Sequence, residues 1–124
     1  MHRPHRFLFT LCIFAIPCFA KNWTGALVDS KCYAYAEGNV NPTDTMTAVD
    51  RDRRSEIRSC SPKAKTKSFT LVQQDGPSFQ LDPAGNIKAS ELVRQIGQKR
   101  LFLVDIAGTM EWNVIKVDSI LLAK

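Results

Sequence analysis

The first twenty residues decide what kind of domain the rest of the chain can form. Met1 to Ala20 begins with basic residues, continues with an apolar run from Phe7 to Ile16 and ends on a small residue. This is the layout of a secretory signal peptide cleaved after Ala20, and the apolar run of about ten residues is too short to span a bilayer. We therefore expect a signal peptide over 1–20, a secreted or periplasmic protein, and one small domain over 21–124.

Cleavage after Ala20 would remove both histidines and two of the four cysteines, Cys12 and Cys18. The net charge falls from +5 to +3 because Arg3 and Arg6 leave with them. A chain with two cysteines and no histidine excludes a Ser-His-Asp or Cys-His catalytic site, a histidine-ligated zinc or copper site, and a four-cysteine zinc site within one chain. Since no later segment approaches about eighteen apolar residues, we expect no membrane span.

The two remaining cysteines, Cys32 and Cys60, enclose the most polar stretch of the chain. Exported proteins fold in an oxidising compartment, so the simplest interpretation is one disulfide, and the alternative is a pair of free buried thiols. Residues 30–68 show no strand pattern, and we expect a long loop there with a short helix within 44–58. Asp29 precedes this loop and is expected to accept backbone N–H bonds that organise its start.

Alternation of apolar and polar residues predicts five strands, which we place at 23–29, 69–74, 78–82, 101–106 and 111–122. A short helix is expected over 91–96, with Ser90 as its cap and Gly97 as its stop. Turns at 83–86 and 107–110 connect these elements.

Five strands with one helix between the third and the fourth is the plan of the OB-fold, a small Greek-key barrel. The expected fold class is therefore all-β with one short helix and a disulfide-tied loop after the first strand. The alternative is an open sheet with the helix packed on one face. The side chains that alternate toward the interior should form the core: Leu71, Phe79, Leu81, Leu92, Ile96, Phe102, Val104, Ile115 and Val117.

The chain resembles a group of small exported bacterial proteins of unassigned function. The likeness rests on the segment Gly25-Ala-Leu-Val-Asp29-Ser30-Lys-Cys32, the later Cys60, Phe69-Thr-Leu-Val and the closing Val-Ile-Lys-Val-Asp-Ser-Ile120. The proteins of this group share a Gly-x-(Ile/Leu/Val)-x-Asp-Ser-x-Cys motif. The likeness covers nearly all of the mature chain, and the group is similar in plan to periplasmic OB-fold proteins. Members often carry extra cysteine and histidine near the first cysteine in a metal-like arrangement. Here Tyr33, Ala34 and Tyr35 follow instead, so no metal site is carried over.

Aromatic and basic residues gather after the first strand. OB-folds bind oligonucleotides or oligosaccharides on strands two and three, helped by the loops after strand one and between strands four and five. Rings for stacking and cations for phosphates suit an anionic or sugar-like ligand. The candidate binding residues are Lys31, Tyr33, Tyr35, Arg51, Arg53, Arg54 and Arg58. The alternatives are a basic loop that is merely solvated, and tyrosines that pack over the disulfide.

Other kinds of site have less support. The carboxylates are scattered over different elements, whereas hydrolysis by paired carboxylates needs two close together. Asp44, Asp50 and Asp52 lack the spacing of a calcium loop. We therefore expect no catalytic residue, metal or cofactor, and a non-enzymatic binding or interaction module for a glycan or an anionic ligand; export argues against nucleic acid. The alternatives are a carboxylate-dependent hydrolase and a structural or stress-protective envelope protein.

Overall fold

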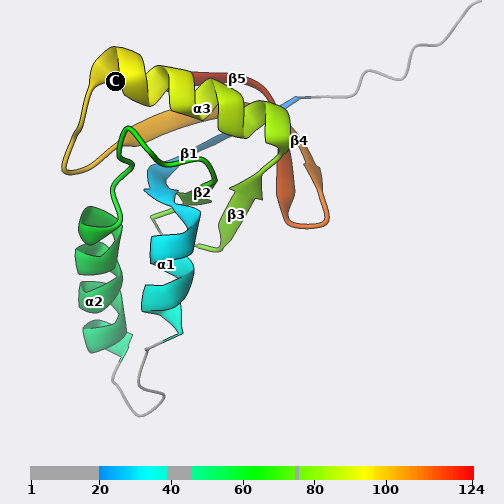
Figure 1. The fold of residues 1–124 in the computed structure, drawn as a ribbon. Coiled ribbons are helices and arrows are strands. Elements are labelled where there is room, and N and C mark those ends of the chain that lie inside the picture. Colours follow the sequence, from blue (N-terminus) through cyan, green and yellow to red (C-terminus); the bar gives the residue numbers. More distant parts are fainter. Residues whose placement is uncertain (1–19, 39–45, 75) are drawn as a thin grey trace, which may run out of the picture.

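Five strands close into a barrel (Figure 1). The computed structural model describes residues 20–38, 46–74 and 76–124, with the backbone alone for 46–52, so residues 1–19 of the predicted signal peptide lie outside the described residues. The strands are β1 (Lys21–Asp29), β2 (Phe69–Val72), β3 (Ser78–Leu81), β4 (Leu103–Glu111) and β5 (Val114–Leu122). Their order around the barrel is β1-β2-β3-β5-β4, and β4 pairs back to β1. All pairs are antiparallel except β3 with β5. The predicted OB-like barrel is confirmed, and the open sheet is excluded.

The described residues also form three helices: α1 (Ser30–Glu37), α2 (Met46–Ser59) and α3 (Pro83–Ile96). In Figure 1, α3 crosses the barrel on one side, and α1 and α2 lie next to each other on the opposite side. The helix between β3 and β4 was expected. The short helix expected within 44–58 is found as α2, which is longer than expected. The rest of the stretch between β1 and β2 was expected to be loop, and that expectation is wrong for residues 30–37, which form α1.

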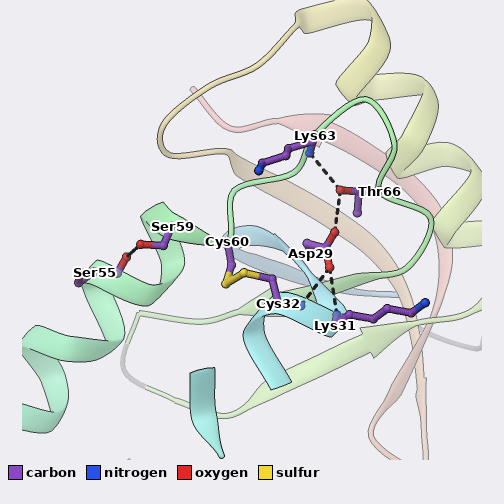
Figure 2. The surroundings of a disulfide bond; sticks show 8 residues. All are labelled: Asp29, Lys31, Cys32, Ser55, Ser59, Cys60, Lys63 and Thr66. Atoms are coloured by element: carbon purple, nitrogen blue, oxygen red, sulfur yellow. Dashed lines mark hydrogen bonds between the residues drawn. A yellow bond between two sulfur atoms is a disulfide. The ribbon is translucent and has the colours of Figure 1, made fainter. Parts of the chain in front are cut away.

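The start of α1 depends on Asp29, the last residue of β1. Its Oδ1 accepts the backbone N–H groups of Lys31 at 3.0 Å and Cys32 at 3.1 Å, which makes it the N-cap of the helix (Figure 2). The expectation that Asp29 accepts backbone N–H bonds is confirmed. Such a cap satisfies amides that have no partner inside the helix. The helix was missed because Tyr33 is the one α1 residue that is fully buried, so no apolar periodicity marks it.

The disulfide between Cys32 and Cys60 is confirmed, with its Cα atoms 5.5 Å apart. It joins the first turn of α1 to the residue that follows α2. A small second core surrounds it, formed by Val28, Tyr33 and Val72. The disulfide thus replaces the apolar contacts that α2, a very polar helix, does not supply.

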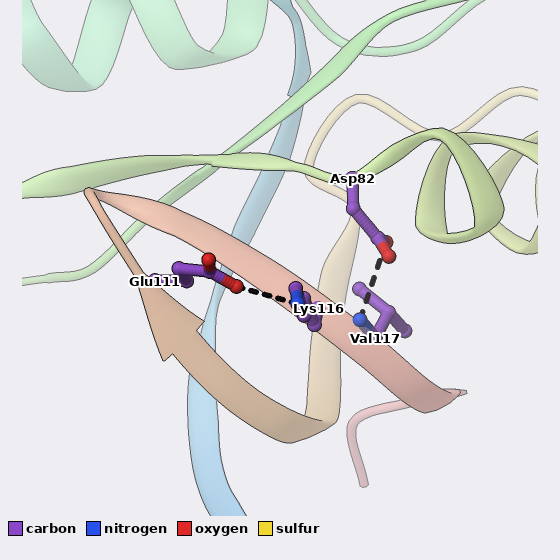
Figure 3. Close-up of polar contacts among 4 residues, drawn as sticks. All are labelled: Asp82, Glu111, Lys116 and Val117. Carbon is purple, nitrogen blue, oxygen red and sulfur yellow. Dashed lines mark hydrogen bonds and ion pairs between the residues drawn. The ribbon is translucent and has the colours of Figure 1, made fainter.

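The first turn of α3 corrects the predicted turn at 83–86. Asp82 is the N-cap; its Oδ1 accepts the Gly85 N–H at 2.8 Å and also the Val117 N–H of β5 at 3.2 Å (Figure 3). Pro83 occupies the first helical turn, where its missing N–H costs nothing. Gly85 packs so closely on the barrel that a Cβ there would lie 2.5 Å from Val117 Cγ2. The turn-forming residues therefore begin a helix that starts two turns earlier than expected.

The β4–β5 hairpin corrects the predicted turn at 107–110. Those residues belong to β4, and the chain reverses at Trp112 and Asn113. Gly108 indicated a turn, but it lies within β4, next to an irregularity in the strand pairing after Ala107. A Cβ at position 108 would collide with the Lys116 carbonyl oxygen, which explains the glycine.

The barrel interior holds most of the predicted core. Buried as expected are Leu71, Leu81, Phe102, Val104, Ile115 and Val117. Phe79 and Leu92 are partly buried and pack against them. Ile96 was wrongly assigned to the core, because its side chain is 40% exposed. All residues from 94 to 101 are exposed, so the end of α3 lies outside the packed interior.

Candidate functional site

A hollow of about 510 Å³ lies against the face formed by β2 and β3. Its floor includes Thr70 of β2 and Gln80 of β3, which are paired directly across the two strands. One wall is α1 and the other is the β4–β5 turn. We call it the Trp112 groove; it is lined by Ser30, Tyr33, Ala34, Glu37, Thr70, Ser78, Gln80, Trp112, Asn113 and Val114. This is the face on which OB-folds bind their ligands.

Trp112 is the most unusual residue of this groove. Its side chain is 91% exposed. Its φ is 51° and that of Asn113 is 62°, so both turn residues adopt the left-handed conformation of a two-residue hairpin loop. Asparagine and glycine tolerate this conformation, whereas a bulky residue there is a genuine outlier. The chain therefore holds a large aromatic ring in water and in an unfavourable backbone conformation.

The turn that carries Trp112 is fixed on both sides. The Asn113 carbonyl oxygen accepts the Gln80 N–H at 3.3 Å, which ties the turn to the groove floor. Lys116 Nζ lies 2.5 Å from Glu111 Oε2 across the hairpin, and both side chains are exposed (Figure 3). The Glu111 carboxylate, through its hydrogen bond and its charge, raises the pKa of Lys116, so this ammonium stays protonated near neutral pH.

The α1 wall offers a phenol and a carboxylate. Tyr33 is 5% exposed, and its hydroxyl is hydrogen-bonded to Glu37 one turn further along the helix. Burial, and then the hydrogen bond and negative charge of Glu37, raise the pKa of Tyr33 well above its ordinary value of 10.0. The phenol is therefore neutral at physiological pH. Among the described residues that line the groove, Glu37 is the one with a formal charge, so cations do not contribute to the lining.

A second hollow, of about 530 Å³, lies on α2. It is lined by Arg54, Ser55, Arg58, Ser59 and Arg100, and we call it the arginine hollow. Arg100 comes from the segment between α3 and β4, whereas the other residues are from α2. The two hollows have no lining residue in common.

The predicted binding residues are divided between these places. Tyr33 lines the Trp112 groove, and Arg54 and Arg58 line the arginine hollow. Lys31 and Tyr35 are exposed on α1 and line neither hollow. Arg53 is half-buried and lies near enough to Tyr33 for its positive charge to oppose the rise in the phenol pKa. The side chain of Arg51 lies outside the described residues.

Sequence reasoning missed Trp112, Asn113 and Arg100. The signal for Trp112 was its position between strands four and five, where OB-folds place a binding loop. That signal was lost when the turn was placed at 107–110. Nothing in the sequence pairs Arg100 with α2, because the two meet only in the folded chain.

Three further observations bear on function. In the described part of the chain, no three His, Cys, Asp or Glu side chains gather in a way that could hold a metal ion. Among the described helices, none is long and apolar enough to cross a membrane. Comparison of the chain with protein-family models, curated proteins and solved structures found no match.

Proposed function

We propose that this protein is an exported, non-enzymatic binding module that holds a neutral glycan in the Trp112 groove. The observation that carries the proposal is Trp112 itself, exposed at 91% and held at a φ of 51° on the rim of the groove. Left-handed conformations of residues that do not favour them cost on the order of 1–3 kcal/mol and concentrate at functional sites. A turn with a purely structural role would be more stable with asparagine or glycine at this position.

The chemistry of the groove suits a sugar. The apolar face of a sugar ring can pack on an indole, which combines a large apolar surface with one N–H donor. Asn113 and Gln80 carry amides that both donate and accept, as sugar hydroxyls require, and Glu37 accepts. A binding site of this kind combines apolar contact with a few polar groups that fix orientation.

The charge of the groove favours a neutral glycan over an anionic ligand. Glu37 repels a negatively charged ligand, and among the described lining residues it has no cation beside it. Hydrolysis by two carboxylates, the enzymatic alternative, takes a pair about 5–10 Å apart. The described lining of the groove offers one carboxylate, which already accepts the hydrogen bond of Tyr33. These features favour binding over hydrolysis.

Export is supported by two independent features. The first twenty residues have the layout of a signal peptide, and the folded chain contains a disulfide, which persists in oxidising compartments such as the periplasm or the cell exterior. Glycans of the cell surface are present in the same compartments.

Two variants of Trp112 test the proposal. Glycan-array screening of the oxidised protein, followed by calorimetry with the best neutral oligosaccharide, should give binding that Trp112→Ala weakens by about 5–150-fold, if the ring contributes about 1–3 kcal/mol as base-stacking aromatics do. Trp112→Asn should abolish the ring contact while the free energy of unfolding stays equal or rises by up to about 1 kcal/mol, because asparagine tolerates a positive φ.

Tyr35→Ala is the matched control, since Tyr35 is an aromatic residue on α1, 78% exposed, that does not line the groove. Its affinity should equal that of the native protein. The proposal fails if no neutral glycan binds, if Trp112→Ala binds as tightly as the native protein, or if Tyr35→Ala loses as much affinity as Trp112→Ala.

A further inference from the structure

We propose that the arginine hollow is a second binding site, which takes the sulfate or phosphate ester groups of an anionic glycan. The site is separate from the Trp112 groove, because the two share no lining residue. It rests on three guanidinium groups gathered around one hollow of about 530 Å³.

The described lining of this hollow carries three positive charges and no carboxylate. Arg54 and Arg58 are four residues apart on α2, so they lie on the same helix face, where like charges destabilise a helix. Arg100 adds a third positive charge to the same hollow. Glu111 of the β4–β5 hairpin pairs with Lys116, so that ion pair involves none of these arginines. A bound anion would relieve this repulsion.

The position of Arg100 is built into the fold. The hydroxyl of Ser61, a buried residue just after the disulfide, donates to the carbonyl oxygen of Lys99. On the other side of Arg100, Phe102 is 1% exposed in the barrel, and its carbonyl oxygen accepts the Leu27 N–H at 2.8 Å. The backbone is thus held at Lys99, directly before the arginine, and at Phe102, two residues after it. Such preorganisation lowers the entropy that is lost on binding.

Ligand chemistry follows from the guanidinium groups. Arginine presents a planar fork that matches the oxygens of phosphate or sulfate in two parallel hydrogen bonds. Three arginines suit a group of high negative charge better than a single carboxylate. The lining contains no aromatic ring on which nucleic-acid bases would stack and no apolar side chain that would enter a membrane, as far as the described residues show. An ester group on a glycan meets these conditions.

The test compares a sulfated oligosaccharide with the same oligosaccharide after desulfation. Calorimetry on the oxidised protein at low salt should detect the sulfated form alone, and binding should weaken with added salt, since several charges carry it. Arg54→Gln and Arg100→Gln should each weaken binding by about tenfold or more, as expected when a charged hydrogen-bonding partner is removed. Arg58→Lys should also weaken it, because an ammonium cannot make the paired contact.

Arg94→Gln is the control, because Arg94 is an exposed arginine in the last turn of α3 that does not line the hollow. It should change affinity by less than about twofold, which would separate a site from a general attraction of the charged surface. Trp112→Ala should also leave affinity for the sulfated form unchanged, so failure of this inference can be told from failure of the glycan groove.

Any of these results would overturn the inference: equal binding of the desulfated form, an equal loss in Arg94→Gln, a loss in Trp112→Ala as large as in Arg54→Gln, or binding to free inorganic sulfate as tight as to the oligosaccharide. Tighter binding to a single-stranded oligonucleotide or to anionic vesicles than to the sulfated oligosaccharide would also overturn it. Thermal unfolding of each variant without ligand should occur at a temperature no lower than that of the native protein, since the replaced side chains are exposed and loss of an arginine charge on α2 lessens the repulsion there.

Discussion

Replacing Asp29 by alanine is expected to lower the free energy of unfolding by about 2–4 kcal/mol. Asp29 lies in the Asp-Ser-x-Cys segment, and both of its carboxylate oxygens are used. Oδ1 caps α1 through the N–H groups of Lys31 and Cys32, and Oδ2 accepts the Thr66 hydroxyl at 2.9 Å (Figure 2). Thr66 Oγ1 in turn accepts the Lys63 N–H at 3.0 Å. One side chain thus joins β1, α1 and the segment that follows the disulfide.

The magnitude has two parts. Loss of an N-cap side chain costs about 0.5–2 kcal/mol. Loss of a charged acceptor leaves the Thr66 hydroxyl, 5% exposed, without its partner, and hydrogen bonds to charged groups are worth about 1.5–3 kcal/mol. Asp29→Asn keeps an oxygen for the cap and removes the charge, so it should cost about half as much as alanine.

The measurement is equilibrium unfolding in urea with the disulfide intact, followed by far-UV circular dichroism. Asp118→Ala is the matched control, because Asp118 is an exposed aspartate on β5, and it should change stability by less than about 0.5 kcal/mol. The slope of unfolding free energy against urea should be the same for all variants. An effect of Asp29→Ala no larger than that of Asp118→Ala would refute the structural role of this side chain.

Three further predictions concern the disulfide, the core and pH. Cys32→Ser should lower the free energy of unfolding in urea by about 2–5 kcal/mol, since it opens a loop with a sequence separation of 28. Labelling of two free thiols in the native sequence, denatured without reduction, would contradict the disulfide. Phe102→Ala should cost about 3–5 kcal/mol, because the ring is 1% exposed in the barrel; a cost below about 1 kcal/mol would contradict its central position. Burial and Glu37 raise the pKa of Tyr33 above 10.0, so the stability that this shift contributes is complete below that pH and is lost as the pH rises above it. Tyr33→Phe should therefore lose less stability than the native protein between about pH 9 and about pH 11, and equal losses would show that Tyr33 does not contribute.

The barrel was predictable because each strand that faces the interior carries its own local signal. At the start of β4, Phe102 just before the strand and Val104 within it are buried, while Leu103 and Asp105 are exposed, which is the period-two pattern of a half-buried strand. The disulfide was predictable by counting, since two cysteines remain after residue 20 and they leave one pairing. Both inferences use information that lies within a few residues or in the composition.

The missed elements are those whose stability comes from contacts distant in the sequence. α1 was missed, and the disulfide that holds its Cys32 ends at Cys60, after α2. A helix was expected where α2 lies, although most of its residues are polar. The first turn of α3 contains Pro83 and Gly85, which indicate a turn in isolation; Asp82 and the close contact with Val117 make it a helix. Gly108 belongs to β4 for the same kind of reason, as it admits the Lys116 carbonyl.

The residue types of the candidate site and the barrel face were predictable, whereas the individual residues that line it were less so. Aromatic rings and arginines were identified, and the face of the barrel was named from the fold plan. In the folded chain Tyr33 of α1 and Trp112 of the β4–β5 turn line one groove, whereas Arg54 and Arg58 line another hollow. A pattern along the chain cannot show which side chains meet across a closed sheet.

The central claim, that a neutral glycan occupies the Trp112 groove, is tested most directly by nuclear magnetic resonance of the nitrogen-labelled, oxidised protein titrated with that glycan. We predict that the largest chemical-shift changes fall on the indole N–H of Trp112 and the backbone N–H groups of Asn113, Gln80 and Thr70, while those of α2 and α3 stay in place. Saturating ligand that moves none of these groove signals, or that moves those of α2 instead, would contradict the account.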